Sequence, residues 1–255
     1  MSRFADRLRR TVARRFLVAL RRATHRLPAR LRALQKERVL VIAPHLDDEA
    51  IPCGGTLLLH AGLGSDAHVV FTTDSAGVSD EPTARQALRD LRRREAAAAK
   101  RILGYGSDEM YDFPDGRLVR HEDALRQRLV GSVRTFAPTQ ILCPFPADSH
   151  ADHQATALAT AHAVAAVGFS GEIWAYEVWT TLWPNVGVDI SSVAADKQRA
   201  IACYASQLDD RDYVAAVMGL NRYRGLQHRV EFAEAYYVCS AREFGALAAN
   251  LDRIP

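Results

Sequence analysis

The 255-residue chain lacks several features that would assign it to a special class of protein. Its four cysteines, at positions 53, 143, 203 and 239, form no C-x-x-C pair, which argues against a zinc knuckle or a disulfide framework and favours a reducing cytoplasm. No run approaches the ~18 apolar residues that span a bilayer, and the longest near the start is Phe16–Leu20. A secretory h-region with a small-residue cleavage site is also missing. These absences favour a cytoplasmic globular protein.

What is present is a composition that can form a core. Hydrophobic residues make up 48% of the chain and charged residues 25%, the usual proportions of a globular protein. A length of 255 residues suffices for one large α/β domain, and no internal repeat or low-complexity linker divides the chain after its amino end. We therefore expect one domain over residues 38–255, preceded by a basic extension over residues 1–37.

Positive charge is concentrated in that extension. Residues 1–38 contain 13 Arg and Lys residues against two acidic residues, a formal charge of +11, so the remainder carries −8 of the total of +3. Apolar residues recur there at every third or fourth position, which predicts an amphipathic helix. Such a helix could lie on an anionic membrane surface, pack on the following domain, or act as a mitochondrial-type presequence. Nucleic-acid binding is not expected, because the segment lacks interleaved aromatics and a fold motif.

Strand-like and helix-like stretches alternate beyond residue 38. This alternation predicts an α/β fold with a mostly parallel sheet. The expected strands cover residues 38–43, 68–72, 110–113, 139–143, 172–179 and 235–239, and the expected helices cover residues 54–61, 83–103, 122–136, 153–167 and 193–206.

Three potential metal ligands lie where the first expected strand ends. His45, Asp47 and Asp48 stand in the segment Ala-Pro-His-Leu-Asp-Asp-Glu, directly after the apolar run 38–43. In α/β proteins, binding sites collect at the carboxyl ends of strands. A histidine and two carboxylates within four residues therefore indicate metal-ligand chemistry at this point.

A second cluster of the same residue types occurs a hundred residues later. The segment Asp148-Ser-His-Ala-Asp-His153 follows the expected strand 139–143 and precedes an Ala-rich helical stretch. Asp and His are also frequent as ordinary polar turn residues at strand ends. Two such clusters, both after strands, make that plainer interpretation the weaker one.

Together the clusters could complete a hydrolytic zinc site. Such a site has three protein ligands of the His, Asp or Glu type and keeps a fourth position for water. Spacing alone leaves open whether Asp47 or Asp48 binds the metal while its neighbour acts as the general base. A protonated His150 could stabilise an oxyanion or protonate a leaving amine.

The pattern His-x-Asp-Asp-Glu followed by His-x-x-His resembles the PIG-L/LmbE family of zinc-dependent N-deacetylases, and the resemblance covers most of residues 38–240. It implies a Rossmann-like, three-layer α/β/α fold. Further segments that fit the family pattern are Cys53-Gly-Gly-Thr56, Arg92-Arg-Arg-Glu95, Leu103-Gly104, Phe113-Pro-Asp-Gly116 and Ala233-Glu-Ala-Tyr236.

The resemblance also assigns roles at the metal. It implies that His45, Asp48 and His153 bind zinc, and that Asp47 is the general base. Two positions depart from the pattern. Leu46 stands where many relatives have proline and contributes no ligand, and Asp148 stands where some branches of the family carry a tyrosine near the scissile amide. An oxyanion tyrosine, if one is used, must therefore come from elsewhere in the chain.

Four further residues receive roles from the resemblance. His150 would stabilise or protonate the transition state, with Asp152 orienting it. Asp115 and Arg92 would contact sugar hydroxyls of the substrate. The residues alone allow plainer roles, because Asp115 begins a good turn dipeptide and Arg92 could pair with Glu95 on its own helix.

The implied function is zinc-dependent removal of the acetyl group from an N-acetylated amino sugar, of N-acetylglucosaminyl type, on a lipid, glycan or small-molecule aglycone. The aromatic segment 174–179 could form a wall for the sugar ring, although core packing is the plainer expectation. An amidase of a larger sugar-linked acyl group or thiol conjugate is the alternative among enzymes. A membrane-peripheral binding protein with a non-catalytic site is the alternative of another class.

Overall fold

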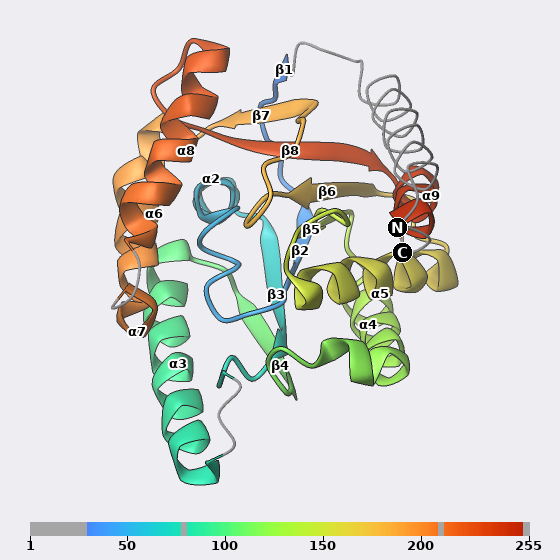
Figure 1. The fold of residues 1–255 in the computed structure, drawn as a ribbon. Helices are drawn as coiled ribbons and strands as arrows, with labels where there is room; N and C mark the ends of the chain where they lie inside the picture. Colours follow the sequence, from blue (N-terminus) through green and yellow to red (C-terminus); the bar gives the residue numbers. More distant parts are fainter. Residues whose placement is uncertain (1–29, 78–80, 209–211, 252–255) are drawn as a thin grey trace, which may run out of the picture.

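A sheet of eight strands runs through the residues that the computed structural model describes, which are 30–77, 81–208 and 212–251 (Figure 1). The strands are β1 (Arg30–Leu31), β2 (Arg38–Ala43), β3 (Asp66–Thr73), β4 (Ser107–Phe113), β5 (Gln140–Pro144), β6 (Glu172–Tyr176), β7 (Val186–Asp189) and β8 (Ala233–Ser240). Their order in the sheet is β1-β7-β8-β6-β5-β2-β3-β4. β8 is antiparallel to its neighbours β6 and β7, and the other pairs are parallel. The mostly parallel sheet expected from the sequence is confirmed.

Helices cover both faces of this sheet and complete the three layers (Figure 1). One face carries α2, α3, α6 and α8, and the other carries α4, α5 and α9. The helical elements are α2 (Gly54–Gly62), α3 (Pro82–Leu103), η1 (Leu118–His121), α4 (Glu122–Phe136), α5 (Ala151–Val167), η2 (Ser191–Val193), α6 (Ala194–Ala202), α7 (Ala205–Leu208), α8 (Tyr213–His228) and α9 (Ala241–Leu251).

The central strand β2 shows why the sequence forms this arrangement. Val39 and Val41 pack into the core on one face of the sheet, and Leu40 and Ile42 into the core on the other. All four side chains are fully buried. A parallel strand with helices on both faces needs apolar residues at every buried position, and the unbroken run 39–43 supplies them after the exposed Arg38.

The chain order creates a crevice at the carboxyl ends of β2 and β5. From β2 the chain proceeds outward through β3 to β4, whereas from β5 it proceeds the other way to β6. β2 and β5 are themselves neighbours in the sheet. In open α/β sheets, ligands bind where the strand order reverses in this way. Each polar cluster of the sequence follows one of these two strands, so the fold brings the clusters together.

Several elements differ from the sequence expectation. The helix expected over 193–206 is divided into α6 and α7, and the strand expected over 172–179 ends at Tyr176. The short strands β1 and β7 and the helices α8 and α9 were not predicted. None of the helices in the described part of the chain is long and apolar enough to cross a membrane.

The predicted basic extension is described only at its end. The amphipathic helix expected there falls mainly on residues 1–29, which lie outside the described residues. Within the described part, Arg30 and Leu31 form β1 and pair with Val186 and Gly187 of β7. The domain boundary at residue 38 stays a prediction, and the sheet begins before it.

Candidate active site

The first cluster forms a tight turn directly after β2. The backbone N–H of His45 donates to Oδ2 of Asp48 at 2.9 Å, and the backbone N–H of Ala50 donates to the carbonyl oxygen of Asp47 at 2.9 Å. Asp47 has a φ of 146°, a backbone region that is strained for residues other than glycine. The turn brings the side chains of His45, Asp47 and Asp48 to one pocket.

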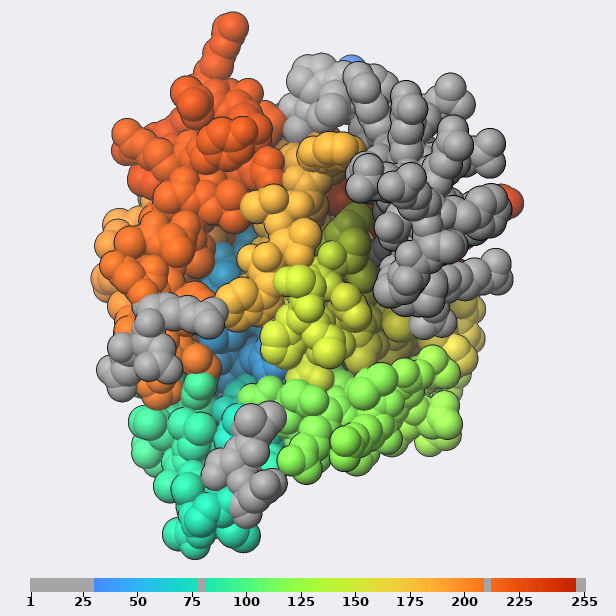
Figure 2. All heavy atoms as spheres, viewed as in Figure 1, coloured from blue at the N-terminus to red at the C-terminus, as the bar shows by residue number. Residues whose placement is uncertain are grey.

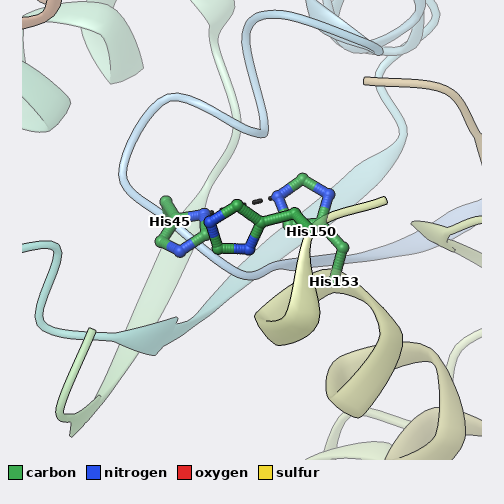
Figure 3. A group of neighbouring side chains, drawn as sticks. All are labelled: His45, His150 and His153. Carbon is green, nitrogen blue, oxygen red and sulfur yellow. Dashed lines mark hydrogen bonds between the residues drawn. The ribbon is translucent and has the colours of Figure 1, made fainter. Parts of the chain in front are cut away.

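The second cluster starts α5. Oδ1 of Asp148 accepts from the backbone N–H of His150 at 2.9 Å, and Nδ1 of His150 accepts from the backbone N–H of Asp152 at 3.2 Å. His150 is therefore the N-cap of the helix. His153, in the first turn of α5, is fully buried, and its ring lies beside that of His45 (Figure 3).

Three side-chain atoms from the two clusters form a small triangle. The distances are 3.1 Å between His45 Nδ1 and Asp48 Oδ2, 3.2 Å between Asp48 Oδ2 and His153 Nε2, and 3.3 Å between the two nitrogens. Metal–ligand bonds of ~2.0–2.1 Å at tetrahedral angles separate neighbouring ligand atoms by about 3.3–3.4 Å. The triangle thus has the dimensions of one face of a tetrahedral metal site.

Two wider groups of potential ligands lie around the triangle. The nitrogens of His45, His150 and His153 lie within 4.8 Å of one another, and so do ligand atoms of His45, Asp115 and Asp152. The described residues therefore contain a possible His/Asp metal-binding site, and the triangle offers it two imidazoles and one carboxylate.

Carboxylates contact the far sides of the two imidazoles. Nε2 of His45 lies 3.3 Å from Oδ1 of Asp115 and 3.3 Å from Oδ2 of Asp152. Nδ1 of His153 lies 3.6 Å from Oδ2 of Asp148, beyond hydrogen-bond length, and no described residue hydrogen-bonds to it. Carboxylates in this position fix the tautomer and the orientation of metal-binding histidines.

The surplus of carboxylates sets the charge balance of the site. Burial lowers the pKa of His45, but hydrogen bonds to Asp115 and to two other aspartates outweigh it and raise the pKa well above its usual value. Burial likewise lowers the pKa of His153, yet Asp48 and Asp148 raise it to about 9. The surroundings of the triangle therefore favour positive charge, as a site for a cation must.

Asp47 differs from the other carboxylates of the site. It is 9% exposed, and among the described residues no group hydrogen-bonds to its side chain. Burial, and then the charge of Asp48, raise its pKa well above the usual range. A carboxyl with a raised pKa suits proton transfer near neutral pH. Its strained backbone is a second sign of a functional position.

The carboxylate of Asp152 lies beside His45. It accepts from the backbone N–H groups of Gly116 at 2.7 Å and Leu118 at 3.0 Å, and one of its oxygens is 3.3 Å from Nε2 of His45. The contact with His150 comes from the backbone N–H of Asp152. The carboxylate thus connects the loop before η1 to His45, and its expected role in orienting His150 stays a prediction.

His150 lies at the edge of the triangle with one ring nitrogen available. Burial, and then the nearby His45 and His153, lower its pKa. Because Nδ1 accepts from the backbone, a neutral ring carries its proton on Nε2. The ring stacks on Trp179 at 6.4 Å between centroids. His150 can thus donate a hydrogen bond from Nε2 without being charged.

These side chains border a space of about 170 Å³, here called the metal pocket. Its walls also contain residues that the sequence did not assign, from the loops and helices across the crevice. The lining residues are His45, Asp47, Asp48, Ile51, Ser75, Arg92, Asp115, His150, Val178, Trp179, Gln207 and Tyr213.

Arg92 enters the metal pocket from α3. The side chain is 8% exposed, and no described residue hydrogen-bonds to its Nε or Nη1. The pair with Glu95 considered from the sequence is not formed, because Glu95 accepts from the backbone N–H of Ser206 at 2.8 Å and from its hydroxyl at 2.6 Å. A contact of Arg92 or Asp115 with a substrate stays a prediction, and both residues are at the pocket.

Sequence reasoning missed several members of this wall. Gln207 and Tyr213 belong to α7 and α8. Ser206-Gln207 resembles a family segment only loosely and received no role, and Tyr213 gave no signal in the sequence. Trp179 was noticed as aromatic, but the structure places it after β6, at the mouth of the pocket and 42% exposed. Asp74, which directly follows β3, is buried and accepts from Arg85 and Arg89, so it is not part of this wall.

Comparison with known proteins adds to this geometry. Residues 40–164, which include both clusters, match the model of the family described as PIG-L, GlcNAc-PI de-N-acetylase. The diacetylchitobiose deacetylase of Thermococcus kodakarensis is 30% identical over 191 residues, 68% of this chain and 71% of that protein. This chain belongs to the PIG-L family.

Two further relatives are similar to most of the chain. The 2'-N-acetylparomamine deacetylase of Streptomyces fradiae is 28% identical over 214 residues, 69% of this chain and 76% of that protein. The structure of N,N'-diacetylchitobiose deacetylase from Pyrococcus horikoshii superposes with a TM-score of 0.73 at 25% identity, covering 91% of this chain and 94% of that one. The three-layer α/β arrangement is thus that of PIG-L family deacetylases.

Proposed function

We propose that this PIG-L family protein is a metal-dependent hydrolase that removes the acetyl group from an N-acetylated amino sugar. The products are acetate and the free amine. The observation that carries the proposal is the triangle of His45, Asp48 and His153 with the strained Asp47 beside it. The printed names of the relatives are in line with it, because each of them is a deacetylase of an N-acetylated compound.

His45, Asp48 and His153 are the proposed metal ligands, and zinc is the proposed metal. Two imidazoles and a carboxylate are a donor set that zinc takes in hydrolytic enzymes, and the spacing of the three atoms fits it. Zinc bound in this way lowers the pKa of a water molecule to about 7 and polarises a carbonyl group. Asp115 and Asp152 contact the ring of His45, and Asp148 contacts the ring of His153, so we propose that these carboxylates hold the two imidazoles in position.

The remaining side chains of the site move the protons. Asp47 takes the proton of the attacking water, which adds to the amide carbonyl carbon. Nε2 of His150 donates a hydrogen bond to the carbonyl oxygen as negative charge develops on it. Asp47 then passes the proton that it took from water to the departing amine. The C–N bond then breaks, which leaves acetate and the amine.

The sugar is held by groups around the mouth of the pocket. Arg92 has two N–H groups without partners among the described residues, and Asp115 is accessible from the pocket, so both are proposed contacts for sugar hydroxyls. The exposed face of Trp179 is the proposed wall for the apolar face of the ring. We propose an N-acetylglucosaminyl-type sugar on a lipid, glycan or small aglycone as the substrate class.

The proposal is tested by metal removal and restoration. Protein treated with a chelator should release no acetate from N-acetylglucosaminides with varied aglycones, and stoichiometric zinc should restore release. Metal analysis of the untreated protein should find about one metal ion per chain. A preparation that binds no metal and gains no acetate release from added zinc would favour the alternative of a non-catalytic binding protein.

We also propose that the enzyme works in the cytoplasm and that its basic extension contacts anionic membrane surfaces. The charge of +11 over residues 1–38 supports this proposal. Because Arg30 and Leu31 belong to the sheet, the truncation that tests it should remove only residues 1–29. The truncated protein should no longer sediment with anionic liposomes yet still cleave a free substrate. Unchanged sedimentation would reject the membrane contact.

A further inference from the structure

A second cavity lies directly beside the metal pocket. Its volume is about 230 Å³, and we call it the side cavity. Figure 2 shows a hollow between the orange residues of α8 and the yellow segments, with blue residues at its floor. The side cavity is lined by Ile51, Pro52, Glu177, Val178, Trp179, Asp212, Tyr213, Ala216, Val217, Leu220, Asn221 and Ala235. Four of these residues, Ile51, Val178, Trp179 and Tyr213, also line the metal pocket, so the two spaces adjoin.

The wall of the side cavity is mainly apolar. Ala216, Val217 and Leu220 lie on one face of α8, at the three- and four-residue spacing of a helix, and border the space. Of the polar members, Glu177 is neutralised by a bidentate ion pair with Arg224, at 2.9 and 2.6 Å. Oδ1 of Asp212 accepts from the backbone N–H of Ala215 at 2.9 Å, and Oδ1 of Asn221 has no partner among the described residues. An apolar group would gain by entering this cavity.

On another side, the metal pocket adjoins a third space, which is wider than the side cavity and has a more polar lining. This space has a volume of about 710 Å³ and is bordered by His150, Ser149, Arg92, Ser206 and Gln207, among others. None of the apolar α8 residues borders it except Tyr213 at its start. A molecule bound at the triangle can therefore extend into a polar space on one side and an apolar cavity on the other.

An amide substrate has an amine part and an acyl part, one on each side of the C–N bond. Each part must lie in one of these two spaces. The amine carries the sugar, whose hydroxyl groups need polar partners, and Arg92, Ser206 and Gln207 border the polar space and not the side cavity. The sugar attached to the amine then lies in the polar space. The acyl group is on the opposite side of the carbonyl, where Ile51 and Val178 open into the side cavity.

We propose that the side cavity receives the acyl chain of the substrate, so that the enzyme prefers amino sugars whose N-acyl group is longer than acetyl. This inference rests on the proposed function, because it takes the triangle as the site of amide hydrolysis. The cavity has the volume of about eight water molecules at ~30 Å³ each, which is room for a short linear chain.

The test compares glucosamine carrying an acetyl, butanoyl, hexanoyl or decanoyl group on its nitrogen, with release of free glucosamine as the readout. Each methylene that becomes buried should raise kcat/KM about fourfold. We therefore expect at least a tenfold rise from acetyl to hexanoyl, with no further rise at decanoyl once the cavity is full. Hexanoate should also inhibit deacetylation more strongly than acetate does, a measurement that needs no variant.

A matched pair of variants on α8 tests whether the preference for longer acyl chains arises in the side cavity. Ala216 borders the side cavity, whereas the adjacent Ala215 does not. Ala216→Phe should lower the ratio of hexanoyl to acetyl kcat/KM at least fivefold, and Ala215→Phe should leave this ratio unchanged. Thermal unfolding of both variants checks that the fold is retained.

The outcomes separate this proposal from the proposed function. Metal-dependent cleavage of the acetyl compound with slower cleavage of every longer chain would overturn the acyl-chain assignment and leave the deacetylase intact. An equal change of the ratio in both variants would also overturn it. No cleavage of any of the four compounds, with metal bound, would overturn both.

Discussion

Two buried clusters of charged groups lie within this fold, and they are built in opposite ways. The first is the metal pocket. The second, here called the anchor network, surrounds Glu234 of β8, whose carboxylate accepts from the backbone N–H groups of Gly55 at 2.7 Å and Thr56 at 2.8 Å. It also accepts from Lys197 Nζ at 2.7 Å and from the hydroxyl of Tyr236 at 2.9 Å. The hydrogen bonds from Gly55 and Thr56 hold the start of α2 against β8 of the sheet.

The two clusters differ in whether their buried polar groups all have hydrogen-bond partners and opposite charges. In the anchor network one buried anion faces one buried cation, and both oxygens of Glu234 have donors. In the metal pocket carboxylates predominate, Nδ1 of His153 and two nitrogens of Arg92 lack hydrogen-bond partners among the described residues, and Asp47 has a strained backbone. Buried polar groups that are satisfied internally hold a fold together, whereas incomplete ones mark the place of a ligand.

Loss of a ligand atom from the triangle is expected to have the largest effect. Asp48→Ala removes the oxygen that lies 3.1 and 3.2 Å from the two imidazole nitrogens, so bound metal and acetate release should both fall below detection. Metal analysis and an acetate assay check this. Asp108→Ala, which removes a carboxylate paired with Lys100 outside the pocket, is the control and should change neither quantity. Full metal content in Asp48→Ala would show that the triangle is not the metal site.

Asp47→Asn is expected to separate chemistry from metal binding. The substitution keeps the size of the side chain, and Asn tolerates a positive φ comparatively well. It removes the proton acceptor, so kcat should fall about 10²–10⁴-fold while one metal ion stays bound. Metal analysis and steady-state kinetics on the same preparation check this. Loss of metal from this variant, with retention in Asp48→Ala, would mean that the two carboxylates have exchanged roles.

The same contrast explains what could be predicted from the sequence. Apolar runs such as 39–43 predicted the central strands, because a strand buried on both faces needs an unbroken apolar run. β1 and β7 were missed because they have only two and four residues. α8 was missed because Asn221, Arg224 and Gly225, its most buried residues, are not apolar and give no helical stripe.

In the site, residue types were predictable and contacts were not. His45 and His153 lie 108 positions apart, and their contact depends on β2 and β5 being neighbours, which no local pattern contains. The residues alone suggested that the two clusters share a site, because both follow strands, but the choice of ligands came from the family resemblance. The contacts of the Asp152 carboxylate could not be predicted, because they depend on the N–H groups of Gly116 and Leu118 in a distant loop.

The anchor network should respond to substitution in stability and not in chemistry. Glu234→Gln leaves the ammonium group of Lys197 buried without a counter-charge, so the free energy of unfolding should fall by about 3–5 kcal/mol. Urea unfolding measures this. Glu231→Gln disrupts an exposed ion pair with Arg222 and should cost less than about 1 kcal/mol. If Glu234→Gln lost its metal under conditions where it remains folded, the anchor network would also affect the metal pocket, and the two clusters would not have separate roles.

Substitution of Asp148, which contacts the ring of His153 on the side away from the triangle, is expected to have the smallest effect on the metal pocket. Asp148 contacts His153 at 3.6 Å, and it also accepts from the backbone N–H groups of His150 and Trp179. Asp148→Asn keeps an acceptor for the backbone but removes the charge, so metal affinity should fall about 10–100-fold and activity should return when zinc is raised. Competition with a chromophoric zinc chelator measures the affinity. If activity fell with affinity unchanged, Asp148 would act on the substrate through His150 and Trp179, and the metal pocket would depend on Asp115 and Asp152 alone for the orientation of its imidazoles.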